Sequence, residues 1–553
     1  MTNADWSRER NKRPLAHLAG VTFHHPGAFW LGAIATAVGV SLHLPMYFGA
    51  REMGYQLVGM PVDTSMLIGM FLIAFGFVAS LYGLYPASAQ ATALRASQIQ
   101  VRSLDEAPLR WAHVGLLLVM AVAVTIDLMK PTTLAFVVPG MALEYGLRSP
   151  LNPTGDVPVA YLPLAGIGGT VLGSFIWGWL GDCIGRRASI LFAAIIFIGT
   201  SICGTMPDYN WNFVMCFLMG IGVGGMLPIS FALIAETIPA RHRGWLMVLI
   251  GGDVAAAYIL TSWLAAELVP LFSWRVLWLL GLPTGLLLVL LNRWIPESPR
   301  YLLATGRDEE ARAVMLRYGA RIVEGPSEIE VEKRVESRWS ELLRGPLAVQ
   351  SLVILLLGIG TGLVLFGFNL WIPTNLHKLG FNEVTADRVL RDSALMGFPF
   401  TFVIAAMYGI WSSKKTLILL AALTAAALLG FAAIGDAAVA NRALLYPLLA
   451  VPIWGINAVT AVLTVYSSEI YPTRIRSRGT GLAAAASKSG GVMIIALVAF
   501  GVAAPSIVGT TLMGGIPMAL AALALAFAGI ETRKRPLEQI TAEELGYGIG
   551  GKI

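Results

Sequence analysis

Charged side chains are scarce in this chain: Asp, Glu, Lys and Arg make up 13% of its 553 residues, whereas 56% of the residues are hydrophobic. A soluble globular domain carries about 25% charged residues. The composition therefore excludes a soluble protein with a charged surface and indicates an integral membrane protein. Apolar runs of membrane-spanning length recur from about residue 28 to about residue 530, which also excludes a soluble enzyme with one anchor.

Cysteine is rare as well. The three cysteines, Cys183, Cys203 and Cys216, lie in or beside apolar segments without the spacing of metal ligands, so we predict a packing role and neither a metal site nor a disulfide framework. The sequence also lacks Gly-x-Ser-x-Gly, Walker and His-Glu-x-x-His motifs, and no segment between the apolar runs is long enough for a nucleotide-binding module. We therefore predict no catalytic residues, no cofactor and no enzyme activity, and we expect energy to come from an ion gradient.

Fourteen apolar segments are long enough to span a bilayer as helices. The first is too long for the core of a cleaved signal peptide, so we interpret it as a retained helix. The predicted helices cover about residues 28–50, 64–88, 112–140, 159–181, 188–206, 211–236, 245–270, 275–295, 350–376, 389–411, 416–435, 442–468, 480–503 and 508–530. The predicted fold class is an all-α integral membrane protein.

Lys and Arg are distributed unequally between the two sides of these helices. If the N-terminus is cytoplasmic, the cytoplasmic segments hold 30 of the 39 Lys and Arg residues and the outer loops hold seven. Cytoplasmic loops of membrane proteins are enriched in these cations. We therefore predict a multi-pass plasma-membrane protein with both termini in the cytoplasm. Because this bias explains the net charge of +6, no nucleic-acid partner is expected.

An internal repeat divides the chain. Two segments that lie 233 residues apart both read Glu-x-x-Pro-x-Arg-x-Arg, and each follows the fourth predicted helix of its half, counted from residue 112. The two copies are Glu236-Thr-Ile-Pro-Ala-Arg241-His-Arg243 and Glu469-Ile-Tyr-Pro-Thr-Arg474-Ile-Arg476. The repeat predicts two six-helix halves of the same orientation. Transporters built in this way bind solute near the midplane and rock one half against the other.

A polar loop separates two of the apolar segments. It reads Gly178-Trp-Leu-Gly181-Asp182-Cys-Ile-Gly185-Arg186-Arg187. An acid and paired arginines do not fit in a bilayer core, so this loop must lie at a membrane face. The corresponding loop of the second half, Gly409-Ile-Trp-Ser-Ser-Lys414-Lys415, keeps the paired cations but lacks the acid. The difference predicts an asymmetric pair of loops.

Together these motifs resemble those of major facilitator superfamily transporters. The spacing Gly-x-x-x-Asp-x-x-Gly-Arg-Arg, the two repeat segments and Pro296-Glu297-Ser-Pro-Arg300 are similar to the branch that holds sugar porters, organic-ion transporters and metabolite:proton symporters. The resemblance covers about residues 112–530 and implies two six-helix bundles, so the two earlier helices are additional and the total is fourteen. The implied parts are a cytoplasmic tail (1–27), two extra helices and a connector (28–111), the first bundle (112–297), a cytoplasmic linker (298–348), the second bundle (349–530) and a cytoplasmic tail (531–553).

The resemblance also implies a cytoplasmic gate. In this superfamily the loop acid and arginines pair with neighbouring helix ends and with the repeat segments, and so hold the inside closed. The alternative is that the arginines only anchor the loops at the cytoplasmic face, which explains neither Asp182 nor the glycine spacing. The predicted gate residues are Gly178, Asp182, Gly185, Arg186, Arg187, Glu236, Arg241, Arg243, Glu469, Arg474 and Arg476.

Four charged residues lie inside predicted helices, where a charge costs roughly 2.5–3.5 kcal/mol on insertion scales unless it has a partner or a cavity. Asp127 and Lys130 are three residues apart, hence on one helix face, directly before Pro131. Either they pair with each other, or Asp127 takes and releases a proton while Lys130 meets an anionic group of the solute. The first helix lines the cavity in the families that the chain resembles, which favours the second interpretation.

Asp253 and Lys488 occupy corresponding positions of the two halves. Each lies nine residues after the glycine that follows its repeat segment, which is roughly 13 Å along a helix. Either these two charges attract each other across the halves and flank a solute, or each has a polar partner within its own half. By the resemblance, Asn369 and Asn457 add uncharged hydrogen-bonding groups to the cavity.

The predicted function is secondary transport of a small organic metabolite, an organic or aromatic acid, by proton-coupled alternating access. The expected partners are the solute, protons and the lipid bilayer, and the protein is expected to be monomeric. The alternatives are a sugar or polyol porter, a drug or organic-cation exporter, and a non-transporting membrane sensor. A sugar is disfavoured because Cys216 stands where sugar porters carry an arginine, and because their glutamine-rich fifth and seventh helices are missing.

Overall fold

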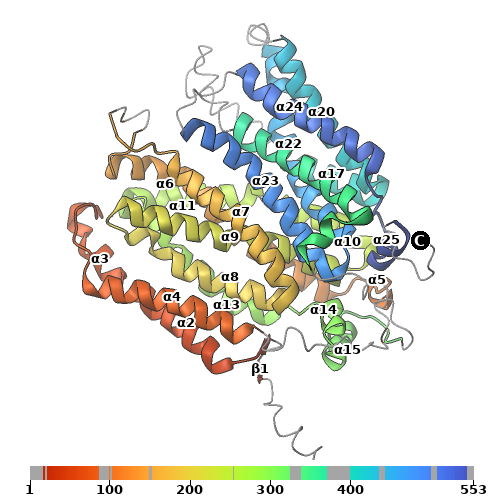
Figure 1. Cartoon of the computed structure of the whole chain (residues 1–553), viewed down its shortest axis with the longest axis horizontal. Helices are drawn as coiled ribbons and strands as arrows, with labels where there is room; N and C mark the ends of the chain where they lie inside the picture. The colour runs from red at the N-terminus through yellow and green to blue at the C-terminus, as the bar shows by residue number, and fades with distance from the viewer. Residues whose placement is uncertain are drawn as a thin grey trace, which may run out of the picture.

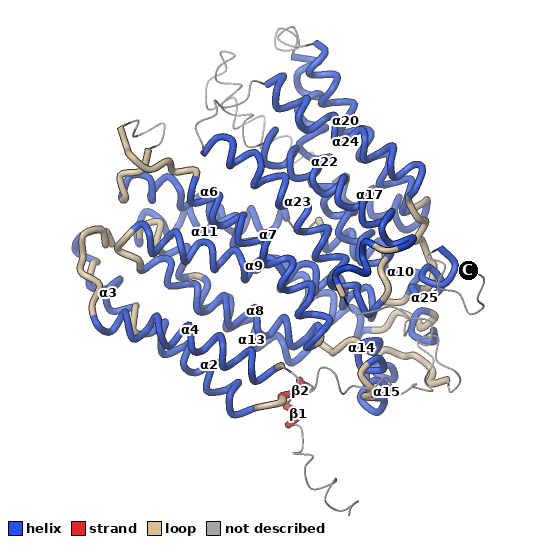
Figure 2. The backbone as a smooth tube through the Cα atoms, viewed as in Figure 1, coloured by secondary structure: helices blue, strands red, loops and turns tan. Residues whose placement is uncertain are grey.

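The computed structural model of this chain is almost entirely helical (Figure 2). It describes residues 16–18, 21–85, 99, 102–148, 152, 154–252, 254–323, 338–369, 399–434, 442–499 and 507–544. The only strands among these residues are β1 (Ala16–Leu18) and β2 (Val21–Phe23), which pair as an antiparallel hairpin.

The first bundle consists of six helical segments (Figure 1). They are α6 (Trp111–Glu144), α7 (Tyr161–Ile184), α8 (Arg186–Thr200) with the 3-10 turn η2 (Ser201–Thr205), α9 (Tyr209–Thr237), α10 (Ala240–Gly251) with α11 (Val254–Phe272), and α12 (Val276–Leu279) with α13 (Gly281–Leu291) and η3 (Asn292–Trp294). Helix α7 packs along α9 because glycines let the backbones approach: a Cβ atom on Gly224 would lie 2.6 Å from the Ser174 nitrogen.

The second bundle repeats this order. Its segments are α17 (Gly345–Gly362) with the π-helical turn η5 (Leu363–Asn369), the helix Pro399–Trp411 ending in the π-helical turn η6 (Met407–Trp411), α20 (Ser413–Ile434), α22 (Arg442–Ile470), α23 (Arg476–Ala499) preceded by η7 (Thr473–Ile475), and α24 (Ile507–Ala528). The two bundles meet where α7, α9 and α10 contact α22 and α23 (Figure 1).

Twelve helices of the described residues are long and apolar enough to cross a membrane. This confirms an all-helical membrane protein, but twelve is fewer than the fourteen predicted spans. The fifth and eighth helices of the predicted core account for the difference, because the structure describes only Ile259–Phe272 and Pro399–Trp411 as their apolar helical parts, and residues 253 and 389–398 lie outside the described residues. A bilayer core of about 30 Å needs roughly 20 helical residues.

A helical hairpin precedes the first bundle. It is formed by α2 (Pro26–Ser41), α3 (Leu44–Gly49), the short turn η1 (Arg51–Met53) and α4 (Thr64–Leu84). Small residues line the contact between α2 and α4, and a Cβ atom on Gly39 would lie 2.6 Å from the Gly69 carbonyl oxygen. Such close helix contacts are typical of packing in membranes. The hairpin contacts α8, so it lies on the outside of the first bundle.

Five short helical segments lie outside the long helices. They are α5 (Arg102–Asp105), α14 (Pro299–Ala304), α15 (Asp308–Arg317), the 3-10 turn η4 (Trp339–Leu343) and α25 (Leu537–Glu544). In the linker, Arg307 and Glu310 form a 2.6 Å ion pair at the beginning of α15.

The far ends of the helices, opposite the polar loop, are joined by a buried arginine. Arg275 is fully buried and forms a 2.7 Å ion pair with Glu144 at the end of α6. Its guanidinium also donates to the Met206 carbonyl oxygen and lies 4.6 Å from the centroid of the Trp274 ring. Glu144 in turn accepts from the Leu57 amide in the loop of the N-terminal hairpin. This Arg275 cluster therefore ties the hairpin to the first bundle.

We expect Arg275→Met to lower the stability of the protein by about 3–5 kcal/mol, because removing one member of a buried ion pair leaves the other charge uncompensated. Thermal unfolding of the purified protein measures this loss. Arg293→Met is the matched control, because Arg293 is exposed, and surface substitutions usually change stability by less than about 0.5 kcal/mol. Equal melting temperatures of the two variants would contradict the assigned role of the cluster.

Candidate functional site

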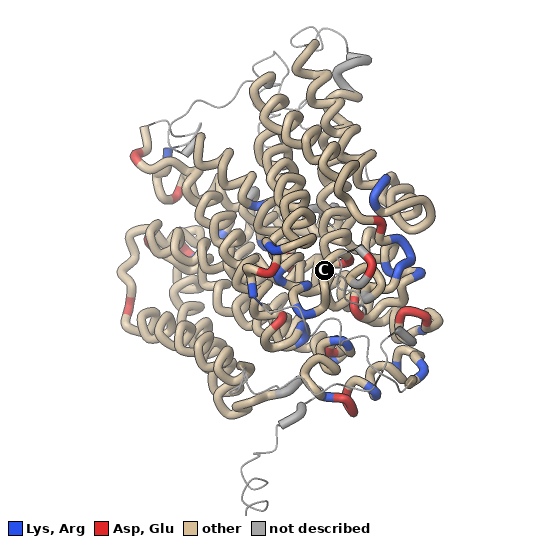
Figure 3. Tube along the Cα trace, turned by 45° about the vertical axis from the view of Figure 1, so that its right-hand side comes forward, with Lys and Arg blue, Asp and Glu red and all other residues tan. Residues whose placement is uncertain are grey.

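Charged residues gather at one end of the two bundles (Figure 3). Eleven of them, drawn from both halves and from α5, are buried against one another, and we call this set the ionic layer. Its members are Asp105, Asp182, Arg186, Arg187, Glu236, Arg243, Glu297, Arg300, Glu469, Arg476 and Arg478. Seven of the predicted gate residues belong to the layer, and four of its residues were not predicted.

The polar loop between α7 and α8 turns at Gly185. This residue has a φ angle of +97°, which glycine adopts without the strain that other residues incur. A Cβ atom here would also collide with the Glu297 carboxylate. That carboxylate accepts from the Arg186 amide at 2.9 Å and thereby caps the first turn of α8. The loop glycine is therefore required both by the turn and by the acid that packs against it.

The other glycines of the loop allow the two bundles to touch. A Cβ atom on Gly178 would lie 2.8 Å from the Ser477 carbonyl oxygen, and one on Gly181 would lie 3.0 Å from the Ser477 hydroxyl oxygen. Ser477 belongs to α23 in the second bundle. The motif glycines thus permit a close contact of α7 with α23 at the ionic layer.

If the chain carries the cytoplasmic gate that its motifs imply, Gly178→Leu should abolish most transport, because a leucine side chain would force α7 and α23 apart. Solute uptake by reconstituted protein measures the effect. Gly168→Leu is the matched control on the same helix, since a Cβ atom there meets nothing within 4 Å. Parent-like uptake by Gly178→Leu would show that close packing at this point is not needed.

Asp182 lies at the beginning of α23. Its carboxylate accepts from the Ser477 amide at 3.2 Å and from the Arg478 amide at 3.3 Å, and it pairs with the Arg478 guanidinium at 2.9 Å. An anion is stabilised at a helix N-terminus by the free amides and the helix dipole. The loop acid of the first half therefore caps a helix of the second half.

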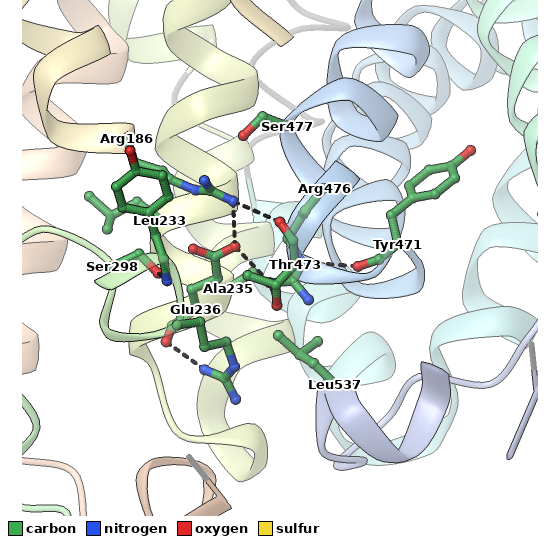
Figure 4. Close-up of polar contacts among 12 residues, drawn as sticks. Arg186, Leu233, Ala235, Glu236, Ser298, Tyr471, Thr473, Arg476, Ser477 and Leu537 are labelled. Carbon is green, nitrogen blue, oxygen red and sulfur yellow. Dashed lines mark hydrogen bonds and ion pairs between the residues drawn. The ribbon is translucent and has the colours of Figure 1, made fainter. Parts of the chain in front are cut away.

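Glu236 lies between arginines of the two halves (Figure 4). Its carboxylate pairs with Arg186 at 2.9 Å and with Arg476 at 2.7 Å, and all three side chains are almost completely buried. Arg186 also donates to the Thr473 carbonyl oxygen across the interface. These contacts connect the first repeat segment with the second.

The second repeat segment makes corresponding contacts. Arg243 pairs with Glu469 at 3.2 Å, and Glu469 also accepts from the hydroxyls of Tyr408 and Thr532. Arg243 further donates to the Arg535 carbonyl oxygen, beyond α24. Each half therefore contributes a glutamate that binds an arginine of the other half.

The acid that the second-half loop lacks is supplied from elsewhere. Glu531, just after α24, accepts from the Ser413 amide at 3.0 Å and from the hydroxyls of Ser412 and Ser413. It caps α20 as Glu297 caps α8, so the two halves are more alike here than the loop sequences indicated. Burial raises the pKa of Glu297. It also acts to raise the pKa of Glu531, but the hydrogen bonds from the serines outweigh it and the pKa of Glu531 falls below its usual range.

Three predicted gate residues remain: Arg187, which belongs to the layer, and Arg241 and Arg474, which do not. Arg187 is buried and donates to the Asn292 side-chain oxygen at 3.2 Å, within the first bundle. Arg241 is exposed and Arg474 is half-buried. Sequence reasoning missed Asp105, Glu297, Arg300 and Arg478 as layer members, although Glu297 and Arg300 belong to a motif that it recognised.

A second polar group lies deeper between the bundles. The Lys488 ammonium on α23 donates to the Ser174 hydroxyl and to the Gly224 carbonyl oxygen, both at 3.2 Å and both in the first bundle. Lys488 and Lys130 both lie within electrostatic range of Asp127. Asp127 is 2% exposed, and its Oδ1 atom has no hydrogen-bond partner in the described part of the chain. A cation of the second half therefore contacts the first half within electrostatic range of a buried acid there.

Lys130 points elsewhere. Its ammonium lies 5.7 Å from the centroid of the Phe197 ring, and a Cβ atom on Gly281 would collide with it. Lys130 is therefore enclosed by α8 and α13 inside the first bundle, not at the contact between the bundles. Pro131, directly after it, removes the helical hydrogen bond to the Asp127 carbonyl group and loosens α6 at this point.

Of the other predicted cavity residues, the structure describes the side chain of Asn457 only. Asn457 on α22 is exposed, and its amide donates to the Ile453 carbonyl oxygen of the same helix. Asn369 ends η5, but its side chain lies outside the described residues, as does Asp253. Within the described residues, no group of three or more His, Cys, Asp or Glu side chains is placed to hold a metal ion.

Three comparisons place this geometry among known proteins. A family model described as "Sugar (and other) transporter" matches residues 164–543. The chain is 25% identical over 399 residues to the niacin transporter NiaP of Acinetobacter baylyi, covering 71% of this chain and 88% of that relative. It is 26% identical over 421 residues to the 4-hydroxybenzoate transporter PcaK of the same organism, covering 73% and 88%.

The fold has close counterparts among solved structures. The proton:xylose symporter XylE of E. coli superimposes with a TM-score of 0.64 at 21% identity, over 78% of this chain and 99% of that structure. The likeness shows the arrangement of the two bundles and leaves the solute open.

Proposed function

The chain belongs to the sugar (and other) transporter family of the major facilitator superfamily, and from this premise we propose that it couples the uptake of a small organic acid to the entry of a proton. The family assignment confirms the resemblance inferred from the motifs. It also makes the chain a membrane transporter of small organic solutes and not an enzyme. The solute, the proton and the residues that bind them belong to the proposal.

The observation that carries the proposal is that Lys488 of the second bundle contacts the first bundle at Ser174 and Gly224, within electrostatic range of the buried Asp127. A buried carboxylate with an unpartnered oxygen is a group that a proton can neutralise at little structural cost. While Asp127 is ionised, it attracts Lys488 and holds the bundles together at mid-depth. Protonation removes that attraction and frees the Lys488 ammonium for the carboxylate of a solute. Proton and acid then enter as a neutral pair.

This assignment changes the role expected of Lys130. The sequence suggests Lys130 as the cation that meets an anionic group of the solute, with Asp127 as the proton-binding acid. Because Lys130 is enclosed by α8 and α13, we assign the anion-binding role to Lys488 instead. Lys130 then compensates charge inside the first bundle, next to Asp127 on the same helix.

The ionic layer acts in this proposal as the gate of alternating access. It is closed in the present structure, since Asp182, Glu236 and Glu469 all bind residues of the other half. Rocking of the bundles breaks these contacts together, as expected for a two-state element. The charge asymmetry of the loops supports a cytoplasmic position of the gate and of both termini. Because the gate is closed, the protein would then be in an outward-facing state.

Several wider features belong to the same proposal. We propose fourteen membrane helices in a monomer of the plasma membrane, with α2 and α4 as additions to the two six-helix bundles. Their hydropathy and their packing against α8 support this count, and the shorter fifth and eighth helices complete the core. The domain boundaries are those inferred from the sequence.

An acid is favoured over a sugar by two observations. The relatives NiaP and PcaK are, by name, transporters of niacin and 4-hydroxybenzoate, and both compounds carry a carboxylate on an aromatic ring. Cys216, which stands where sugar porters have an arginine, is fully buried, and its thiol contacts the Asn212 side-chain oxygen at 3.3 Å. A neutral sugar also leaves Lys488 without a counter-charge.

A ligand-stabilisation screen tests the proposal. The purified protein is heated with niacin, 4-hydroxybenzoate, xylose or a quaternary ammonium ion, and the shift in melting temperature is measured. A ligand at 100 times its Kd stabilises the folded state by about 2.7 kcal/mol. We expect a shift with one or both acids and its loss in Lys488→Gln. Stabilisation by xylose or by the cation alone would refute an acid solute.

A further inference from the structure

We propose that Asp105, in the segment between the N-terminal hairpin and the first bundle, is an additional gate residue that holds the ionic layer closed. The proposal rests on the gate function proposed above. Asp105 lies in α5, outside the polar loop and both repeat segments, and no motif of the sequence pointed to it. It is 5% exposed.

The Asp105 carboxylate joins two arginines of different motifs. One oxygen pairs with Arg243 of the first repeat segment at 3.1 Å, and the other pairs with Arg300 at 2.5 Å. Arg243 is the residue that reaches Glu469 in the second bundle. Arg300 donates to the Glu236 carbonyl oxygen, directly behind the glutamate that binds Arg476. Asp105 therefore positions the first-bundle partners of two of the inter-bundle contacts, Arg243–Glu469 and Glu236–Arg476.

The charge balance of the layer shows why this acid is needed. The layer contains six buried arginines and five buried carboxylates, so without Asp105 four carboxylates would face six arginines. Buried cations without counter-charges are costly, whereas water solvates them once the bundles separate. Loss of Asp105 therefore destabilises the closed state more than the open state.

The segment around Asp105 is packed into the protein. The neighbouring Leu104 is 1% exposed, Ala107 is 8% exposed, and both belong to the main hydrophobic core. Helix α6 begins only six residues further on, at Trp111, and it carries Asp127 about 24 Å along its axis. A single chain segment thus connects the proposed proton site with the gate.

A native thiol provides a test of the proposal. Cys183 lies next to Asp182 in the layer and is half-buried, whereas Cys203 and Cys216 are fully buried inside the first bundle. The rate at which a maleimide labels Cys183 in the purified full-length protein therefore reports opening at this end. We expect Asp105→Asn to raise this rate at least fivefold and Glu106→Gln, at the exposed next residue, to leave it within twofold of the parent rate.

Three outcomes distinguish a failure of the proposed role of Asp105 from a failure of the proposed gate. If Glu236→Gln speeds labelling and Asp105→Asn does not, the gate stands and the role of Asp105 is refuted. If neither variant speeds labelling, the gate assignment fails, and the role of Asp105 fails with it. If Asp105→Asn does not yield folded protein, Arg300→Lys decides, because it weakens the same contact and retains the positive charge. Parent-like labelling of that variant would overturn the proposal.

Discussion

Asp127→Asn is expected to abolish concentrative uptake and to preserve solute exchange. Asparagine resembles the protonated carboxyl group in shape and charge, so the variant behaves as if a proton were always bound. The loaded carrier can still cycle, but it no longer couples its movement to a proton gradient. The parent, with one proton per solute, reaches about tenfold accumulation for each unit of pH difference.

Reconstituted vesicles separate these two activities. Accumulation of labelled niacin or 4-hydroxybenzoate is measured under an imposed pH gradient, and exchange is measured with solute on both sides and no gradient. We expect the accumulation ratio of Asp127→Asn to fall to about one, with exchange within a few-fold of the parent. A loss of both activities would indicate a structural or solute-binding role for Asp127.

Asp63→Asn is the control for a general effect of removing an aspartate. Asp63 is exposed and caps α4 by accepting from the Met66 amide at 2.8 Å, a role that asparagine also fills. The Asp63→Asn variant should accumulate solute like the parent. Normal accumulation by Asp127→Asn would refute proton coupling through this residue.

Glu236→Gln is expected to open the ionic layer. It removes the carboxylate that binds Arg186 and Arg476, one from each bundle. Breaking a buried ion pair costs about 3–5 kcal/mol in the state that buries it. Since about 1.4 kcal/mol is a factor of ten, the closed state loses roughly two to three and a half orders of magnitude in relative population if the open state solvates both arginines.

The labelling rate of Cys183 measures this shift when opening and closing are faster than the reaction. We expect an increase of at least tenfold, larger than that of Asp105→Asn, because Glu236 contacts both bundles directly. Glu309→Gln, on the exposed face of α15, should label at the parent rate. An unchanged rate in Glu236→Gln would mean that these ion pairs only anchor the loops, as in the alternative weighed from the sequence.

The two bundles and the polar loop could be predicted because their signals are local. Gly185, Asp182 and the two repeat segments lie in short motifs whose spacing is visible in the sequence, and the structure places most of them in one layer. Charge scarcity likewise indicated membrane helices. Such signals need no knowledge of which helix faces which.

Contacts between distant segments could not be predicted in this way. Asp105 joins the layer only because α5 folds beneath α10, and nothing in its own sequence marks it. The direction of Lys130 depends on helix rotation, which a three-residue spacing does not fix. Glu531 is a different case. It lies 234 residues after Glu297, which is close to the 233 residues that separate the two repeat segments. A comparison of the segments that follow the last helix of each half would therefore have found it.

The capping of α23 by Asp182 gives the interface a fixed polarity. An ion pair between two side chains can in principle be reversed, with the acid and the base exchanged between partners. Asp182, however, also accepts from the Ser477 and Arg478 amides, and backbone amides cannot become acceptors. The exchange of Asp182 for arginine and Arg478 for aspartate would place a cation against the positive end of a helix. The two halves, although they repeat one sequence pattern, are therefore not interchangeable at this contact.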